Sequence, residues 1–297
     1  MKFLIIGHSV VDKIIDNKGV SIKPGGIFYT TVSFLSQLNK DDNLFLCTSI
    51  DESNEELFMD YYQSVEKDYI YKVDSIPRVE LKIDNVGERK ESYSQISQNL
   101  IIPEENLNQF DGILINMISG FDISVSQLQH IRKNYDGLIY FDVHTLSRGV
   151  DKNFNRNFKK IEKFNTWAAC IDILQTNESE LHTLSKNDNE TQIIEELLNI
   201  GVKQVIVTRA ERGATIFFRD NGITKNIYRE AFKMILINKV GCGDVFGAVY
   251  FYNYKKNKNV FLALERANLF AGLSTTYSHP KEFLNLRIDG HKVISKK

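Results

Sequence analysis

The sequence contains little cysteine, almost no net charge and no long apolar run, and each shortage excludes a class of protein. Its three cysteines, Cys47, Cys170 and Cys242, are widely spaced and odd in number, which fits reduced thiols and excludes a zinc-binding spacing. The formal net charge of −1 gives no broad attraction to nucleic acid or to anionic membranes. Apolar runs such as 3–6 and 113–115 are far too short to span a bilayer.

The composition that remains is that of an ordinary globular protein. The 297 residues are 42% hydrophobic and 25% charged, which suffices to bury one large core or two modest ones. No linker, internal repeat or low-complexity stretch interrupts the chain, and its first residues lack the apolar core and cleavage site of a signal peptide. We therefore expect a single domain over residues 1–297 and a cytoplasmic location.

A glycine-rich loop that leads into an apolar helix is the most informative segment. Gly241, Cys242 and Gly243 precede Asp244, and the run 245–252 is apolar almost all round, so its N-terminus should point into the core. The glycines let a ligand approach the backbone, and the N–H groups of a first helical turn have no intrahelical acceptor. The segment therefore predicts a phosphate site. Asp244 beside it can accept a proton from a hydroxyl group, although an aspartate that only caps a helix gives the same pattern.

A second glycine-rich helix start lies near the N-terminus. Residues 2–7 read as a buried strand, and the polar stretch 8–12 follows its carboxyl end and closes with Asp12. Gly25 and Gly26 then open a helix whose apolar residues recur at helical spacing. The glycines and the Asp12 carboxylate are therefore expected at the same end of the first strand.

Strands alternate with helices along most of the chain. Strands are expected at 44–47, 112–116, 138–142, 170–174 and 204–207. This alternation predicts a mostly parallel sheet with helices on both faces and ligands at the carboxyl ends of its strands. One stretch differs, because 79–83 and 91–96 alternate their side chains around a turn at 84–87 and so predict a hairpin.

Three motifs occur in a familiar order: Gly25-Gly26, an N-x-x-E at 177–180 and the G-x-G-D at 241–244. Together with Asp12 they resemble the ribokinase-like (phosphofructokinase B type) carbohydrate kinase family, nearly from end to end. The resemblance implies a three-layer α/β/α fold with a mostly parallel central sheet, helices on both faces and a small β lid from about 70–100. It also implies ATP-dependent phosphorylation of a hydroxyl group on a sugar or sugar-like molecule, with Mg²⁺ as cofactor.

The resemblance assigns a role to each matching residue. Asp244 is the expected base, and the amides of Gly241, Cys242 and Gly243 are expected to hold the transferring phosphate. The expected substrate-binding residues are Asp12, Gly25, Gly26 and Thr30. The expected nucleotide-side residues are Thr208, Gly213, Asn268 and Lys239. Mg²⁺ is expected to be held through water by Asn177 and Glu180, a pair that a helix capping box explains as well.

Three positions depart from the family pattern. Ala210 stands where the T-x-G-x-x-G motif has its first glycine, and an alanine can still turn there if its φ stays negative. Thr30 stands where these sugar kinases often have asparagine, so sugar recognition must differ. Lys239 lies in a segment that helps hold a monovalent cation in many relatives. Its ammonium is expected to replace that ion or to contact the phosphate directly, which leaves a monovalent-cation requirement doubtful, unless the side chain simply points to solvent.

The sequence leaves other interpretations open. A nucleoside kinase would use Phe28 and Tyr29 to line a larger acceptor pocket. A catalytically idle ligand-binding member of the fold is suggested by Ala210 and Lys239, although the intact Asp244 argues against it. The lid hairpin also suggests a homodimer formed through the lid, but its charged side chains can equally blunt an edge strand.

The stretch 141–148 follows another expected strand and can line the same pocket. It carries Asp142 and Arg148, although a strand-end aspartate and an exposed arginine are also ordinary structural residues.

Overall fold

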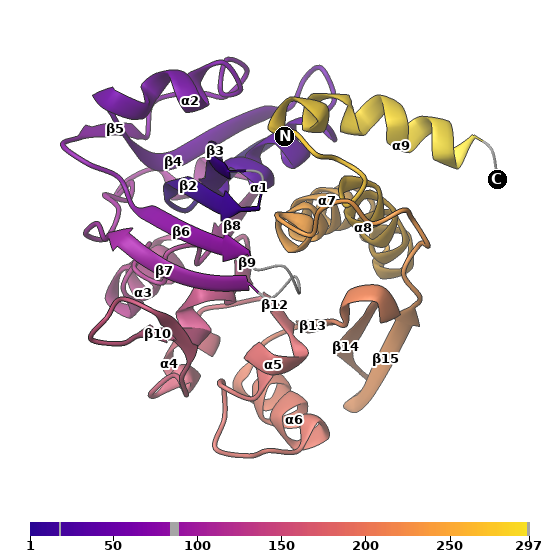
Figure 1. Ribbon diagram of the computed structural model, residues 1–297. Helices are drawn as coiled ribbons and strands as arrows, with labels where there is room; N and C mark the ends of the chain where they lie inside the picture. Colours follow the sequence, from indigo (N-terminus) through magenta and orange to yellow (C-terminus); the bar gives the residue numbers. More distant parts are fainter. Residues whose placement is uncertain (18, 84–88, 296–297) are drawn as a thin grey trace.

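A large sheet runs through the middle of the molecule (Figure 1). The computed structural model describes residues 1–17, 19–83 and 89–295. In spatial order, the strands of this sheet are β15 (Ile223–Arg229), β14 (Ala214–Asp220), β13 (Gln204–Thr208), β12 (Ile173–Asn177), β9 (Leu138–Asp142), β8 (Gly112–Asn116), β1 (Lys2–Ile6), β4 (Asn43–Asp51) and β5 (Ile70–Val73). Neighbouring strands are parallel except at one edge, where β14 pairs antiparallel with both β13 and β15.

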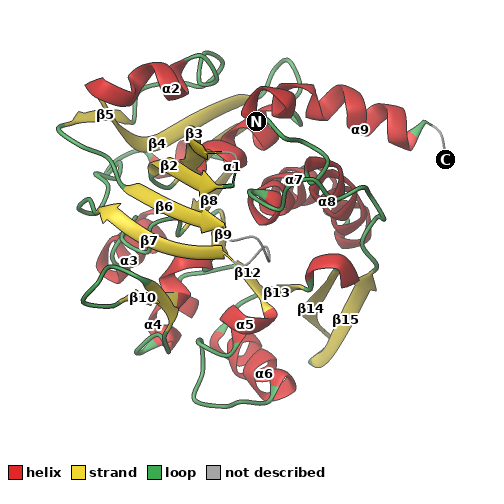
Figure 2. Ribbon diagram, viewed as in Figure 1, coloured by secondary structure: helices red, strands yellow, loops and turns green. Residues whose placement is uncertain are grey.

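Helices cover both faces of this sheet (Figure 2). They are α1 (Ile27–Leu35), α2 (Glu55–Met59), α3 (Val125–Asn134), α4 (Phe164–Ala168), α5 (Glu178–Leu181), α6 (Glu190–Ile200), α7 (Cys242–Asn257), α8 (Val260–Ser274) and α9 (Leu286–Ile294). Among the described residues, none of these helices is both long and apolar enough to cross a membrane.

Alternate side chains of each central strand enter two separate cores, as a sheet buried on both faces requires. In β1, Phe3 and Ile5 pack into the core shared with α1, α7 and α8, whereas Leu4 and Ile6 pack into the core shared with α3 and α6. The predicted three-layer α/β/α fold is therefore confirmed.

Helix α7 lies deep in one of these layers, between α1 and α8. Its residues from Val245 to Asn253 are all buried, which explains why the sequence here is apolar all round. The N-terminus of α7 therefore faces the interior beside the strand ends. Helix α1 is also buried on all sides, rather than along a single stripe.

A second sheet of four strands forms the lid, with the order β3 (Gly19–Gly26), β2 (Ser9–Asp16), β6 (Arg78–Ile83) and β7 (Arg89–Gln95). The predicted hairpin is confirmed in the antiparallel pairing of β6 with β7, while its turn at 84–87 lies outside the described residues. The expected lid range of about 70–100 supplies only β6 and β7 of this sheet, because β2 and β3 also belong to it. Asp12 therefore lies within a lid strand rather than in a loop.

A short ribbon of β10 (Arg148–Val150) and β11 (Arg156–Phe158) adjoins the outer edge of β7. The backbone N–H of Tyr93 donates to the carbonyl of Phe154 at 2.9 Å, and Ser92 forms a bridge with Asn155. This edge of the lid is therefore covered by the chain itself.

Two predicted elements were misplaced. The strand expected at 170–174 is β12 (Ile173–Asn177), because its first residues belong to the turns that end α4: the Cys170 N–H donates to the Trp167 carbonyl. These turn residues are buried like a strand, and apolar content alone does not distinguish the two. The apolar residues 57, 58, 61, 62 and 65 fall at helical spacing and predict a helix after β4. Helix α2 ends at Met59, however, and the later apolar residues lie in turns.

Candidate active site

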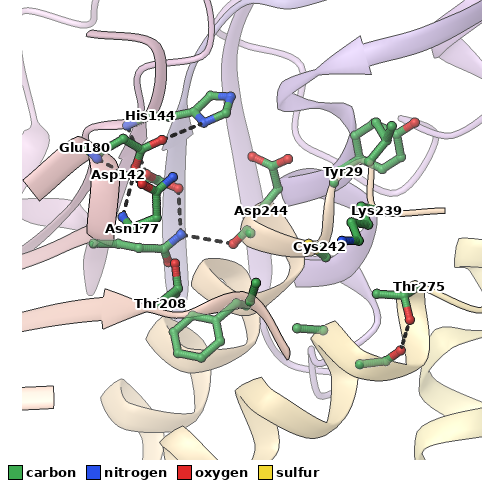
Figure 3. A pocket seen from close by; sticks show the side chains of 18 of the residues that line it. Tyr29, Asp142, His144, Asn177, Glu180, Thr208, Lys239, Cys242, Asp244 and Thr275 are labelled. Carbon is green, nitrogen blue, oxygen red and sulfur yellow. Dashed lines mark hydrogen bonds and ion pairs between the residues drawn. The ribbon is translucent and has the colours of Figure 1, made fainter. Parts of the chain in front are cut away.

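A cavity of about 570 Å³ opens at the carboxyl ends of the central strands. Its lid end is lined by side chains of β2 and β6, including Asp12, Val79 and Leu81. Its α8 end is lined by the turn at 208–213, by residues between β15 and α7, and by α8 itself. Asp244 stands between the strand-end cluster and Lys239 in Figure 3.

Gly241 fixes how the chain enters α7. It caps the helix with φ of +80°, and a Cβ atom at this position would overlap the ring of Tyr29. Both constraints require glycine. The helix then begins at Cys242, so the free N–H groups of its first turn face the cavity.

The Asp244 carboxylate is held by an amide from a neighbouring strand. Asn116, the last residue of β8, donates from Nδ2 to Asp244 Oδ1 at 2.7 Å and to Thr30 Oγ1 at 3.0 Å. Thr30 is buried and is not among the residues that line the cavity, and Asn116 connects it to Asp244. The departure from asparagine at this position therefore affects the setting of Asp244 more directly than it affects a bound sugar.

Gln175 on β12 connects the first turn of α7 to the central sheet. Its Nε2 donates to Asp142 Oδ2 at 2.8 Å and to the carbonyl of Gly243 at 3.1 Å, while its Oε1 accepts from the Tyr140 hydroxyl. Gly247 leaves room for it, because a Cβ there would lie 2.8 Å from Gln175 Oε1. Burial, with the nearby carboxylates of Glu180 and Asp244, holds the pKa of Asp142 well above the usual range.

Asn177 and Glu180 form the capping box that was the alternative to a magnesium site. Asn177 Oδ1 accepts from the Glu180 N–H at 2.9 Å, and Glu180 Oε2 accepts from the Asn177 N–H at 3.0 Å. The second oxygen, Oε1, lies 3.8 Å from Nδ1 of His144. Although burial opposes the charged form, Glu180 and neighbouring carboxylates raise the pKa of His144 to about 9.

Asp12 and the two glycines after it form a close-packed unit. Asp12 is 8% exposed and lines the cavity, and a Cβ at Gly25 would overlap its carboxylate. Gly26 has φ of +66°, and a Cβ there would overlap the carbonyl oxygen of His8. The glycine pair is therefore required by the protein's own packing, before any ligand is considered.

The α8 end of the cavity brings together three of the expected nucleotide-side residues. Thr208 ends β13, and Gly213 adopts φ of +95° where a Cβ would overlap the Arg229 carbonyl. Asn268 is buried rather than exposed, and its Nδ2 donates to the same carbonyl of Arg229 at 3.2 Å. The turn, β15 and α8 are thus joined around one backbone oxygen.

The turn at Ala210 does not meet the condition of a negative φ. Its φ is +48°, in the left-handed region that glycine adopts without cost. The turn therefore keeps the geometry that a glycine would give it, and the alanine is accommodated with backbone strain.

Lys239 and Cys242 lie close together at the entrance to α7. Lys239 is exposed and lines the cavity, and the Lys239 carbonyl accepts weakly from the Cys242 N–H at 3.5 Å. Burial, together with the Asp244 charge, raises the pKa of the Cys242 thiol, and the Lys239 ammonium opposes part of this rise. Cys242 therefore stays a protonated thiol and contributes its backbone rather than a nucleophile.

A family model, pfkB family carbohydrate kinase, matches residues 126–285, which is more than half of the chain. The chain belongs to this family. The matched region includes the N-x-x-E and G-x-G-D motifs, and the lid and the Gly25-Gly26 helix start lie outside it.

The chain is also similar to individual members of this kinase family. Deoxyribokinase of Salmonella typhi is 28% identical over 116 residues, which is 37% of this chain and 37% of the length of that relative. Ribokinase of Thermotoga maritima is 17% identical and covers 99% of both chains with a TM-score of 0.74. Ribokinase of Arabidopsis thaliana, complexed with ribose and ATP, is 17% identical and covers 96% of this chain and 98% of its own with a TM-score of 0.71. These structures share the fold.

Two residues of this candidate site were not identified from the sequence. Asn116 closes a strand that was predicted with its correct bounds, so its polar side chain at a carboxyl strand end was the available signal. Gln175 lies within a buried strand, where a lone polar side chain signals a hydrogen-bonded partner.

We predict that kcat/KM of the enzyme rises with pH on an acidic limb that lies above the usual aspartate value of about 3.9. Burial, aided by the Glu180 charge, raises the pKa of Asp244. A base must be deprotonated to act, so a raised pKa moves the loss of activity to higher pH. His144 lowers the Asp244 pKa, so His144→Gln should move the limb higher still. The pH profile of kcat/KM measures both, and a limb at or below about 3.9 would exclude Asp244 as the base.

Proposed function

We propose that the protein is an ATP-dependent kinase that phosphorylates a hydroxyl group of a sugar or sugar-like compound. One observation carries the proposal: the Asp244 carboxylate and the N-terminus of α7 open into the same cavity, together with the Asp12 carboxylate. A hydroxyl group and a phosphoryl group can therefore meet beside a base and an anion site. Phosphoryl transfer depends mainly on such alignment and charge stabilisation.

Each residue acts in the proposed reaction through its position. Asp244 takes the proton of the attacking hydroxyl, and the amides of Gly241, Cys242 and Gly243 stabilise the transferring phosphoryl group. Asp12 binds other hydroxyl groups of the acceptor. Gly25 and Gly26 allow the acceptor to approach the start of α1.

The α8 end of the cavity suits a nucleotide base. Apolar side chains line it, namely Ala231, Phe232, Met234, Leu236 and Ala271. An aromatic base can lie among them with its polar edge toward Asn268, while Thr208 and Gly213 lie nearer the phosphate path. These contacts support ATP as the donor.

The site suits a Mg²⁺ ion that binds together with the nucleotide phosphates. In the described part of the chain, no group of three or more His, Cys, Asp or Glu side chains could hold a metal by itself. Asn177 and Glu180 use one oxygen each in the capping box and keep further lone pairs for bound water. Mg²⁺ commonly keeps several waters and binds substrate phosphates, where it neutralises their charge.

A screen for ADP release tests the proposal. Sugars, sugar phosphates and nucleosides are each incubated with the protein and Mg-ATP, and ADP is measured against a reaction without acceptor. Acceptor-dependent release supports a kinase. ATP binding without release for any acceptor would instead indicate the catalytically idle alternative.

The nucleoside kinase alternative loses one of its two supporting residues. Phe28 is completely buried and packs against Tyr61, whereas only Tyr29 lines the cavity. The ring of Tyr29 contacts the Gly241 backbone, so it supports the anion site rather than an acceptor base.

The position of Lys239 predicts that activity depends little on which monovalent cation is present. Its ammonium lies beside Cys242, so it is expected to supply the positive charge that many relatives obtain from a bound monovalent ion. Activity in sodium, potassium and choline buffers of equal ionic strength should be similar, and Lys239→Thr should lower kcat or create a potassium requirement. Strong potassium activation of the unmodified protein, with a silent Lys239→Thr, would contradict this role.

A homodimer through the lid remains part of the proposal, and β3 is the strand that suits it. The opposite edge, β7, is already covered by Phe154 and Asn155. On β3, Val20 and Ile22 are 63% and 52% exposed, an apolar edge of the kind that pairs with a second copy. Sedimentation equilibrium gives the mass that decides this.

A further inference from the structure

Two arginines from the β10–β11 ribbon line the lid end of the cavity. In the ribbon, Arg148 lies opposite Phe158 and Val150 lies opposite Arg156. Because side chains alternate along a strand, this register places Arg148 and Arg156 on the same face, diagonal to each other. The roles proposed above use neither of them.

Arg148 keeps its hydrogen-bond donors free of the protein. Across residues 1–17, 19–83 and 89–295, no hydrogen bond from its side chain is found, and its Nε is buried without a partner. The nearest carboxylate oxygens, on Glu91 and Glu180, both lie 4.0 Å away, beyond hydrogen-bond distance. The guanidinium is held in place over the ring of Phe158, 4.7 Å from its centroid. Its donors are therefore available to a ligand.

Arg156 is more deeply buried and more firmly fixed. Its side chain is 6% exposed, NH1 donates to Glu91 Oε2 at 2.9 Å, and NH2 donates to the Tyr93 hydroxyl at 2.5 Å. The guanidinium also stacks on the Tyr93 ring at 4.3 Å. Its Nε is buried and has no partner in the described part of the protein. This arginine is therefore held rigidly at the cavity wall, where it contributes its positive charge.

Few carboxylates lie close to these two groups. Among the described residues, the carboxylates within 4.0 Å of the two guanidiniums are Glu91, which both share, and Glu180. Glu180 is already occupied by the Asn177 N–H and faces His144, whose raised pKa keeps it positively charged at neutral pH. Neither carboxylate is within hydrogen-bond distance of Arg148, so its terminal N–H groups can receive an anionic group from the cavity.

The distance between Asp12 and the arginines is one that a single acceptor molecule can span. In the lid, Asp12 pairs with Val79, and Val79 pairs with Tyr93, on which Arg156 stacks. Two strand spacings separate Asp12 from Tyr93, which is about 10 Å. An acceptor whose hydroxyl groups bind Asp12 can therefore present a terminal group to the arginines across the lid.

We propose that the acceptor carries an anionic group, a phosphate or a carboxylate, which Arg148 and Arg156 bind at the lid end of the cavity. Guanidinium groups match both anions with paired N–H donors. The proposal rests on the kinase function above, and it narrows the acceptor from sugars in general to sugar phosphates and sugar acids.

Matched acceptors test this proposal. Ribose, fructose and glucose are compared with their terminal monophosphates and with the corresponding sugar acids, using ADP release with Mg-ATP. For at least one sugar, the anionic form should have a kcat/KM about 10-fold or more above that of the neutral parent, and the better of the two anionic arms identifies the group. Equal or better use of every neutral parent overturns the proposal and leaves the kinase function standing. No release with any acceptor overturns the kinase function and this proposal with it.

Arg148→Gln separates recognition from structure, because the native side chain makes no hydrogen bond that the fold would lose. It should lower the ratio of kcat/KM for the anionic acceptor to that for its neutral parent by about 10-fold or more. The matched control is Arg219→Gln, since Arg219 forms its ion pair with Glu195 on the surface of β14, and this ratio should not change. Equal loss with both acceptors in Arg148→Gln would show a structural role and overturn the proposal.

Discussion

Asp244→Asn is expected to lower kcat by about 100-fold or more while leaving the fold and ATP binding largely intact. The substituted amide cannot take a proton from the acceptor hydroxyl. It retains an oxygen, however, and Asn116 Nδ2, which donates to Asp244 Oδ1 at 2.7 Å, can donate to that oxygen as well. The entrance to α7 should therefore keep its shape.

Three measurements check this expectation: kcat with an acceptor from the screen, nucleotide affinity by calorimetry, and the thermal unfolding midpoint. A matched control is Asp289→Asn on α9, an aspartate that pairs with Lys292 and is not among the residues that line the cavity. Near-normal turnover of Asp244→Asn with a proven substrate would remove Asp244 from the mechanism.

Asp12→Ala should raise the KM of the acceptor by about 10-fold or more and leave the KM of ATP nearly unchanged. The Asp12 carboxylate lines the lid end of the cavity, away from the α8 end. Each charge-assisted hydrogen bond from an acceptor hydroxyl contributes roughly 1.5–3 kcal/mol. Steady-state kinetics with each substrate varied in turn give both constants.

The conservative variant Asp12→Asn helps to interpret that result. Its amide oxygen can still accept one hydroxyl, so its effect on the acceptor KM should lie between those of the wild type and Asp12→Ala. If Asp12→Ala weakens both substrates equally, the residue supports the lid rather than the acceptor.

The local pattern of apolar and polar residues predicted the strands of the central sheet well where these strands are short and buried. The bounds of β8 and β9 agree with the sequence-based ranges 112–116 and 138–142. It failed for the lid, because the pairing of β2 with β6 joins segments far apart in the chain, and no local pattern encodes that register. The sequence also does not reveal the positive φ of Ala210, since tertiary packing can hold a residue in a conformation that its side chain disfavours.

In the candidate site, too, the sequence revealed residues with a local signal and missed those defined by long-range contacts. Glycines at helix starts and polar residues at strand ends have local signatures, so Gly241, Asp244 and Asp12 could be singled out from the sequence, and the structure brings them to one cavity. Their roles remain predictions. Asn116 and Gln175 take their importance from contacts with other elements, which are visible only once the chain has folded.

The close packing of Gly25 against Asp12 has a consequence for how such sequences can diverge. Any side chain at position 25 would displace the Asp12 carboxylate, so substitution of the glycine is harmful only while the aspartate is present and needed. Positions 12 and 25 should therefore change together among related sequences. Where the aspartate is replaced by a smaller residue, other residues can replace the glycine, and where the aspartate is kept, the glycine should be kept as well.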